Sequence, residues 1–164
     1  MANKIISISY GYAQSPFGTC CIAWVNDQIC ALSFFDEDDF EFDKLKNHFP
    51  DSRFERNDIL AKRKATSIFI NKEKQSLLLI GTDFQRKIWN ELLRIPAGTT
   101  STYSDVADAV GHPSALRAVG TAIGANPIAY LVPCHRIIRS DGSLGGYRWG
   151  LEMKKKILAS ENAL

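Results

Sequence analysis

The chain has 164 residues, of which 45% are hydrophobic and 23% are charged. This composition is ordinary for a globular protein and fits one medium domain or two small ones. The net charge of +2 is too small by itself to indicate nucleic-acid binding, although residues 82–164, with 10 basic and 7 acidic side chains, are mildly basic. Neither a signal peptide nor a run of the ~18–20 apolar residues of a membrane span is evident. We therefore expect a cytoplasmic protein without a membrane partner.

The four cysteines, Cys20, Cys21, Cys30 and Cys134, do not form a disulfide framework or a zinc-ligand spacing. The first three lie in apolar, strand-like runs and are expected in the core. A reducing compartment fits this pattern best. We predict no metal and no cofactor.

The first part of the chain, residues 1–80, mixes strands and helices and shows no catalytic constellation. Asn26-Asp27 joins two β-type runs as a hairpin signal, Phe40 belongs to the apolar stripe of the first helix, and Asp58 is the expected N-cap of the second. We expect strands over 4–10, 19–25, 28–35, 52–56 and 76–80, and helices from the acidic stretch 36–43 to Pro50 and from 58 to about 71.

At Gly81 the pattern changes to successive helices, so a second domain is expected over residues 81–164. Thr82 and Gln85 form a capping-box signature for a helix running to about 96. A short helix over 102–110 and another starting at Pro113, joined by a glycine-containing turn, predict a helix-turn-helix.

The second helix of this pair has a core stripe and a face of small residues. Its one charge is Arg117. Such a face could approach a nucleic-acid groove with little sequence-specific readout, or it could pack tightly inside the protein with Arg117 paired to a carboxylate. The stripe is Leu116, Val119 and Ile123, and the small residues are Ala118, Thr121, Ala122, Gly124 and Ala125.

Cys134 stands between Pro133 and His135 in an apolar run, which places it at the end of an expected buried strand. His135 and Arg136 would bring a base and a positive charge close to the thiol, whose thiolate is the nucleophilic form. A buried structural cysteine is an equally good interpretation of this segment alone. A turn-rich loop over 139–150 and a final helix over 151–164, with Lys154 at least partly exposed, follow.

Several spaced segments of the second half resemble the O6-alkylguanine-DNA alkyltransferase family. The most specific is the active-site signature, here Val132-Pro133-Cys134-His135-Arg136. The others are Gly81–Gln85 with Ile88-Trp89, Ile95–Gly98, Thr102-Tyr103, Arg117–Gly120, Gly124–Pro127 and Gly142–Gly150. The first half is only loosely similar.

The resemblance implies that an alkyl group leaves O6 of guanine, or O4 of thymine, and stays on Cys134, so that each molecule acts once as a methylated-DNA–protein-cysteine methyltransferase. His135 would help to deprotonate the thiol through a water, and Glu161 would orient His135. Tyr103 would donate to the departing guanine, and Asn126 would link the recognition helix to the active-site loop.

The same resemblance assigns the substrate-binding residues. Tyr147 is implied as an aromatic of the base pocket, Lys154 as a neighbour of the leaving O6, and Arg117 as the side chain that replaces the flipped nucleotide. Arg148 replaces a smaller residue of some relatives at the pocket rim, so we expect large alkyl groups to be transferred less well.

The implied fold is a two-part α/β (α+β) protein. A ribonuclease-H-like α/β domain precedes a mostly helical, winged-helix-like domain with the helix-turn-helix. The expected partner is the minor groove of double-stranded DNA, bound by a monomer. A non-catalytic lesion-binding relative is the alternative, which the presence of Cys134 disfavours. A cysteine hydrolase is disfavoured because His48 and His112 are expected at the surface.

Overall fold

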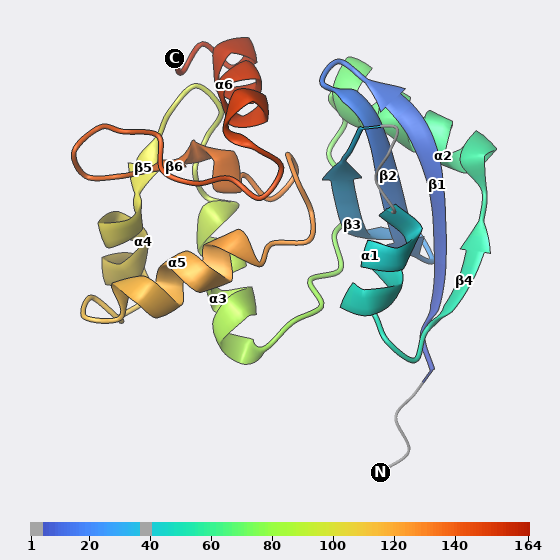
Figure 1. Cartoon of the computed structure of the whole chain (residues 1–164), viewed down its shortest axis with the longest axis horizontal. Helices are drawn as coiled ribbons and strands as arrows, with labels where there is room; N and C mark the ends of the chain where they lie inside the picture. The colour runs from blue at the N-terminus through green and yellow to red at the C-terminus, as the bar shows by residue number, and fades with distance from the viewer. Residues whose placement is uncertain (1–4, 37–40) are drawn as a thin grey trace. The chain divides into compact units, whose positions relative to one another are not determined.

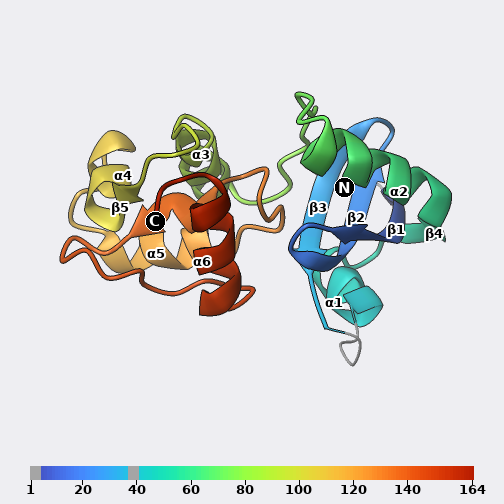
Figure 2. The same ribbon diagram turned by 90° about the horizontal axis from the view of Figure 1, so that it is seen from above.

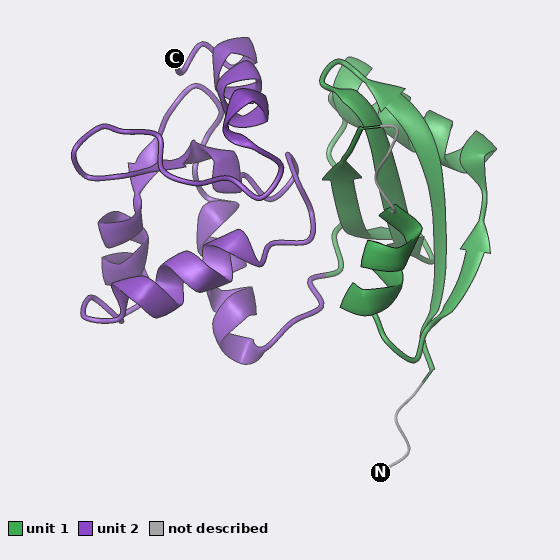
Figure 3. Ribbon diagram, viewed as in Figure 1, with its two compact units in different colours: residues 1–78 green, residues 79–164 purple. Residues whose placement is uncertain are grey.

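The structure, a computed structural model, describes residues 5–36 and 41–164. It divides into two compact units, Met1–Leu78 and Leu79–Leu164 (Figures 1 and 3). This division lies close to the domain boundary expected at residue 81. Phe40, expected in the first helix, lies outside the described residues.

Unit 1 is built on a four-stranded sheet with the order β3-β2-β1-β4. The strands are β1 (Ser7–Ser15), β2 (Gly18–Val25), β3 (Gln28–Phe34) and β4 (Arg53–Arg56). β1, β2 and β3 are antiparallel neighbours, and β4 runs parallel to β1. The hairpin at Asn26-Asp27 is confirmed, whereas the strand expected over 76–80 is wrong, because only an isolated bridge between Ile29 and Leu77 forms there.

Two helices cover opposite faces of this sheet, α1 (Glu41–His48) and α2 (Asp58–Ala65), with α2 continued by a π-helical segment, η1 (Thr66–Ile70) (Figure 2). The N-cap of α2 is Asn57, whose side chain accepts from the Leu60 amide at 3.0 Å, and not the expected Asp58. Gly11 permits α2 to approach β1 closely, because a Cβ there would lie 2.5 Å from the Asn57 carbonyl oxygen.

Unit 2 contains α3 (Asp83–Leu92), α4 (Tyr103–Ala109), α5 (Leu116–Gly124) and α6 (Leu151–Ser160). The two short strands β5 (Ser101–Thr102) and β6 (Ile137–Ile138) pair in parallel. The capping box of α3 is confirmed, since Gln85 N lies 3.1 Å from Thr82 Oγ1 and Thr82 N lies 3.0 Å from Gln85 Oε1. An α+β sheet unit followed by a helical unit is therefore the fold, as expected.

The helix-turn-helix is α4 and α5, and α3 packs against both. α5 begins at Leu116, later than the expected Pro113, so Leu116 at the helix start is 45% exposed and not part of the core stripe. Ala122, expected on the outer face, is buried, and its carbonyl accepts a 2.8 Å hydrogen bond from the Trp89 indole. The exposed small face is therefore Ala118, Thr121 and Gly124.

The run from Ile128 to Val132 forms turns and not the expected buried strand. Tyr130 adopts a φ of 68°, which a continuous strand excludes. Cys134 instead begins a single 3-10 turn, η2 (Cys134–Arg136), which leads directly into β6. Among the described residues, no helix has the length and apolarity needed to cross a bilayer.

Candidate functional site

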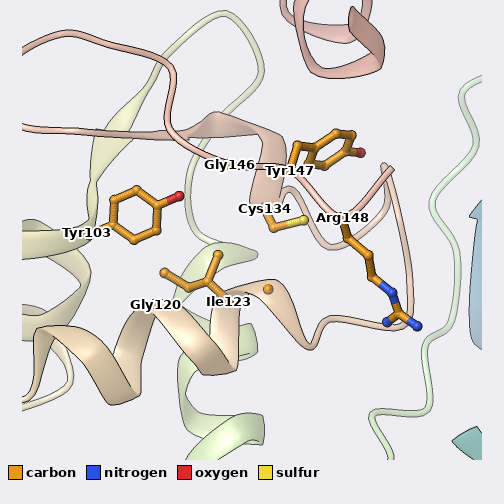
Figure 4. A pocket seen from close by; sticks show the side chains of 8 residues that line it. Tyr103, Gly120, Ile123, Cys134, Gly146, Tyr147 and Arg148 are labelled. Carbon is orange, nitrogen blue, oxygen red and sulfur yellow. The ribbon is translucent and has the colours of Figure 1, made fainter. Parts of the chain in front are cut away.

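Cys134 lines a cavity of about 250 Å³ within unit 2 (Figure 4). The thiol comes from η2, and Tyr103, the first residue of α4, and Tyr147, in the loop before α6, lie on opposite sides of it. The remaining walls come from α5 and the same loop. The full lining is Tyr103, Gly120, Ile123, Gly124, Cys134, Gly146, Tyr147 and Arg148. The small residues along α5 leave this space open.

Asn126, two residues after the end of α5, is fully buried and contacts the sulfur. Its Oδ1 accepts from the Ile128 amide at 2.9 Å. Its Nδ2 donates to the carbonyls of Ile128 and Val132 and lies 3.3 Å from the Cys134 Sγ. This single amide therefore fixes both the turn after α5 and the position of the thiol.

His135 is fully buried and its Nε2 lies 2.8 Å from Glu161 Oε1. Burial lowers the pKa of His135 below its ordinary 6.5, so the ring is neutral at pH 7. Facing a carboxylate, the neutral ring carries its proton on Nε2 and leaves Nδ1 as an acceptor. Nδ1 is buried and has no hydrogen-bond partner in the described part of the chain.

Glu161 also receives two hydrogen bonds from Arg136, at 3.1 and 2.5 Å. Burial raises the pKa of Glu161, but the hydrogen bonds from His135 and Arg136 outweigh it and hold the pKa at about 2. Arg136 further donates to the Ile95 carbonyl at 2.6 Å. The guanidinium of Arg136, which was expected beside the thiol, therefore pairs with the Glu161 carboxylate instead.

The Cys134 thiol is only 6% exposed, and burial raises its pKa to about 11. The Asn126 amide and the charges of Lys154 and Arg148 act in the opposite direction and favour the thiolate. A base must therefore remove the proton before the sulfur can attack.

Among residues 5–36 and 41–164, no three His, Cys, Asp or Glu side chains gather as metal ligands would.

The two pocket tyrosines are both protonated at neutral pH. Burial raises the pKa of Tyr103 above 10, and it raises that of Tyr147 further. The Tyr147 hydroxyl is buried without a hydrogen-bond partner among the residues described. Gly145, with φ of 71°, passes so close to Tyr103 that a Cβ there would lie 3.1 Å from the hydroxyl.

Arg148 and Lys154 hold the loop that carries Tyr147. Arg148 donates to the Asn126 carbonyl at 3.1 Å, and its guanidinium lies 5.4 Å from the Trp149 ring centre. Lys154 was expected to be at least partly exposed, but its side chain is fully buried and its Nζ donates to backbone carbonyls. α6 turns this position towards the loop, and the two following lysines face outward.

Arg117 does not line the pocket. It is exposed near the start of α5, on the same helix as Gly120 and Gly124 of the cavity wall. Within the described residues it forms no ion pair, so the alternative in which Arg117 pairs with a local carboxylate has no support there. The structure therefore brings together all the expected site residues except Arg117, which it places on the adjacent surface.

Sequence reasoning missed the contact between Arg136 and Glu161 and the lining role of Gly120, Ile123 and Gly146. The adjacency of Arg136 to His135 was visible, but its partner is 25 residues away in sequence. The small residues of α5 are also apparent in the sequence, but only the fold shows which side of this helix lines the cavity with the thiol.

Two family models together match most of the chain. Residues 83–163 match the 6-O-methylguanine DNA methyltransferase DNA binding domain, and residues 8–65 match the ribonuclease-like domain of the same proteins. The regulatory protein Ada of Salmonella typhimurium is 36% identical over 95% of this chain and 46% of its own length. The inducible methylated-DNA–protein-cysteine methyltransferase of Bacillus subtilis is 56% identical over 49% of this chain and 45% of its own length. The chain spans about half the length of the curated relatives it matches.

Solved structures match both units. The crystal structure of Mycobacterium tuberculosis OGT in complex with DNA is 33% identical, covers 94% of this chain and 93% of its own, and has a TM-score of 0.76. The O6-methylguanine-DNA methyltransferase of Pyrococcus kodakaraensis, at 23% identity and a TM-score of 0.69, shows the same fold over 94% of this chain and 98% of its own.

Proposed function

The chain belongs to the 6-O-methylguanine DNA methyltransferase family, and we propose that it repairs DNA by transferring an alkyl group from O6 of guanine, or O4 of thymine, to its own Cys134. The observation that carries this proposal is a cysteine lining a base-sized cavity beside a neutral histidine that is held by a carboxylate. The reaction uses no cofactor, and each molecule acts once, in the cytoplasm.

The chemistry is displacement at the alkyl carbon. The Cys134 sulfur forms a bond to that carbon while the bond from the carbon to O6 breaks and its electron pair leaves with the guanine. The thiol proton passes through a bridging water to Nδ1 of His135, the nitrogen that Glu161 leaves free as an acceptor. The hydroxyl of Tyr103, protonated and facing the cavity, donates to the guanine ring as it takes up the negative charge.

A base paired within a duplex cannot enter this cavity, so the damaged nucleotide must be flipped out, at a cost of a few kcal/mol. Arg117, exposed beside the cavity on α5, takes the place of the flipped base in the stack. The small exposed residues Ala118, Thr121 and Gly124 allow α5 to lie in the minor groove. With so few polar side chains there, a single protein molecule binds with little sequence preference.

The proposal is tested by the intact mass of the protein after incubation with duplex DNA containing O6-methylguanine. We expect every molecule to gain the mass of one methyl group, which peptide mapping places on Cys134, and we expect no gain in Cys134→Ala. Binding of the damaged DNA without any gain in mass would instead establish the non-catalytic lesion-binding alternative. Repeated turnover by one protein molecule would also reject the proposal.

A further inference from the structure

Lys154 is a fully buried cation that no carboxylate contacts within the described residues. Its Nζ donates to the carbonyl oxygens of Ile137 at 2.6 Å, Gly146 at 3.2 Å and Leu144. An ammonium group has three hydrogens, so these three acceptors use all of them. No donor is left for a base in the cavity.

The three carbonyls belong to two segments, β6 and the loop before α6, whose relative position determines the shape of the cavity beside Cys134. Ile137 is in β6, which directly follows the turn that carries Cys134. Leu144 and Gly146 are in the loop before α6, and Gly146 and its neighbour Tyr147 line the cavity. This loop contains no helix or strand, and Gly142 and Gly145 have positive φ angles. The lysine therefore ties an otherwise irregular cavity wall to the segment of the nucleophile.

The charge of Lys154 has a second role. Lys154 interacts electrostatically with two charged or titratable groups, Cys134 in η2 and Arg139 in the loop, and its charge also acts on His135. A buried ammonium without a carboxylate is costly. Ionised Cys134 is the one anion among these groups, and it supplies the missing counter-charge when its proton leaves.

We propose that Lys154 is a positioning residue, which fixes the Gly146–Tyr147 wall of the cavity against the Cys134 segment and balances the charge of the thiolate, and which does not contact the departing base. This inference rests on the proposed function and replaces the role near O6 that the family resemblance implies.

The test uses a reaction that needs no DNA. Lys154→Met is compared with Lys155→Met, which changes the exposed neighbour on the same helix. The rate at which iodoacetamide labels Cys134 is measured by peptide mass from pH 6 to pH 10, and hydrogen exchange is followed over residues 139–147. For Lys154→Met we expect labelling about tenfold slower at pH 6 to 7, because less thiolate forms without the cation. Burial lowers the pKa of Lys154 to about 8, so the difference in labelling should shrink above that pH, where the wild type also loses the charge. We also expect faster exchange of the loop amides in this variant. Lys155→Met should match the wild type in both.

A second variant separates the positioning role from the charge role, and it keeps the proposal testable if Lys154→Met does not fold. Lys154→Gln keeps two donors without the charge, so it should slow labelling as much as Lys154→Met while retaining more protection in the loop. An unchanged labelling profile and an unchanged loop, together with slower alkyl transfer from DNA, would assign Lys154 to the leaving group and overturn the proposal. Failure of the proposed function would instead appear as an absent methyl adduct in the wild type, with both of these readouts intact.

Discussion

The side-chain amide of Asn126 lies 3.3 Å from the Cys134 sulfur while it also donates to the carbonyls of Ile128 and Val132. Asn126 lies two residues after the end of α5, so the end of the proposed DNA-binding helix and the proposed nucleophile share one buried group. An amide NH2 has only two hydrogens, and three acceptors surround it, so both hydrogens are engaged and the side chain is held in one orientation.

Replacing this amide by a carboxylate should damage the site. Asn126→Asp removes the donor and places a negative charge beside the sulfur, so the pKa of Cys134 rises and less thiolate forms. We expect alkyl transfer to slow by roughly 30-fold, equivalent to about 2 kcal/mol. Single-turnover rates with methylated duplex DNA measure this effect. Asn90→Asp, on the exposed side of α3, is the control and should leave the rate unchanged.

Loss of the Glu161 carboxylate should alter how stability depends on pH. Its pKa is held at about 2, below its ordinary 4.5, by the hydrogen bonds from His135 and Arg136, which outweigh burial. A carboxyl group with a lowered pKa stabilises the fold above its unfolded value, and that contribution is lost as the pH falls from 4.5 towards 2. We therefore expect Glu161→Gln to lower the free energy of unfolding by about 2 kcal/mol at pH 7 and by less near pH 3.

Urea unfolding at both pH values measures this difference. The exposed Glu152→Gln serves as the matched control and should behave like the wild type. An equal loss for Glu161→Gln at pH 7 and pH 3 would show that the carboxylate is not the source of the stability.

The close approach of Gly145 to Tyr103 predicts a selective effect on the reaction. A Cβ at Gly145 would lie 3.1 Å from the Tyr103 hydroxyl, whereas a Cβ at Gly142 would meet nothing within 4 Å, although both residues have positive φ angles. Gly145→Ala and Gly142→Ala should therefore have similar backbone strain, of order 1 kcal/mol. Only Gly145→Ala should slow alkyl transfer, by about tenfold, in single-turnover assays, because it displaces the tyrosine. Equal rates for the two variants would contradict this role of Tyr103.

The exposed position of Arg117 predicts a dependence on the form of the substrate. Arg117→Ala should reduce alkyl transfer from duplex DNA by about tenfold or more, because the unfilled gap raises the cost of flipping the base. Transfer from a free O6-alkylguanine base, which needs no flipping, should keep the wild-type rate. Comparable losses with both substrates would rule out the base-flipping role.

Arg148 at the cavity rim predicts a limit on the size of the alkyl group. Its guanidinium is held by the Asn126 carbonyl and the Trp149 ring, so it does not move aside freely. Arg148→Ser should raise the rate of transfer from O6-benzylguanine DNA relative to O6-methylguanine DNA by several-fold. Arg94→Ser, which replaces an exposed arginine, should leave that ratio as in the wild type.

The sequence predicted the structural elements that depend only on residues close together in the chain. The capping box of Thr82 and Gln85 and the hairpin at Asn26-Asp27 depend on residues that are near one another in the chain. Ile128–Val132 was different, because its apolar residues suggested a strand. In the structure these residues are buried through turns that the Asn126 side chain holds, a contact that apolar pattern alone does not reveal.

The sequence motif and the family resemblance predicted residues of the candidate site, but not the contacts that those residues make with distant parts of the chain. Cys134 and His135 stand together in the chain, so their proximity needed no fold. The pairing of Glu161 with Arg136, and the burial of Lys154 against backbone carbonyls, depend on how α6 packs on η2 and the loop. Backbone carbonyls occur at every position, so no sequence pattern marks the ones that a buried lysine will bind.

Burial of the Cys134 sulfur also bears on how long the protein lasts before use. With a pKa of about 11, the thiol remains protonated at neutral pH, and oxidants react with the thiolate far faster than with the thiol. If Cys134 accepts one alkyl group and is not regenerated, as proposed, a molecule whose sulfur has been oxidised by peroxide can no longer carry out the transfer. The burial that makes a proton acceptor necessary for the proposed reaction would therefore also protect from oxidation the molecules that have not yet reacted.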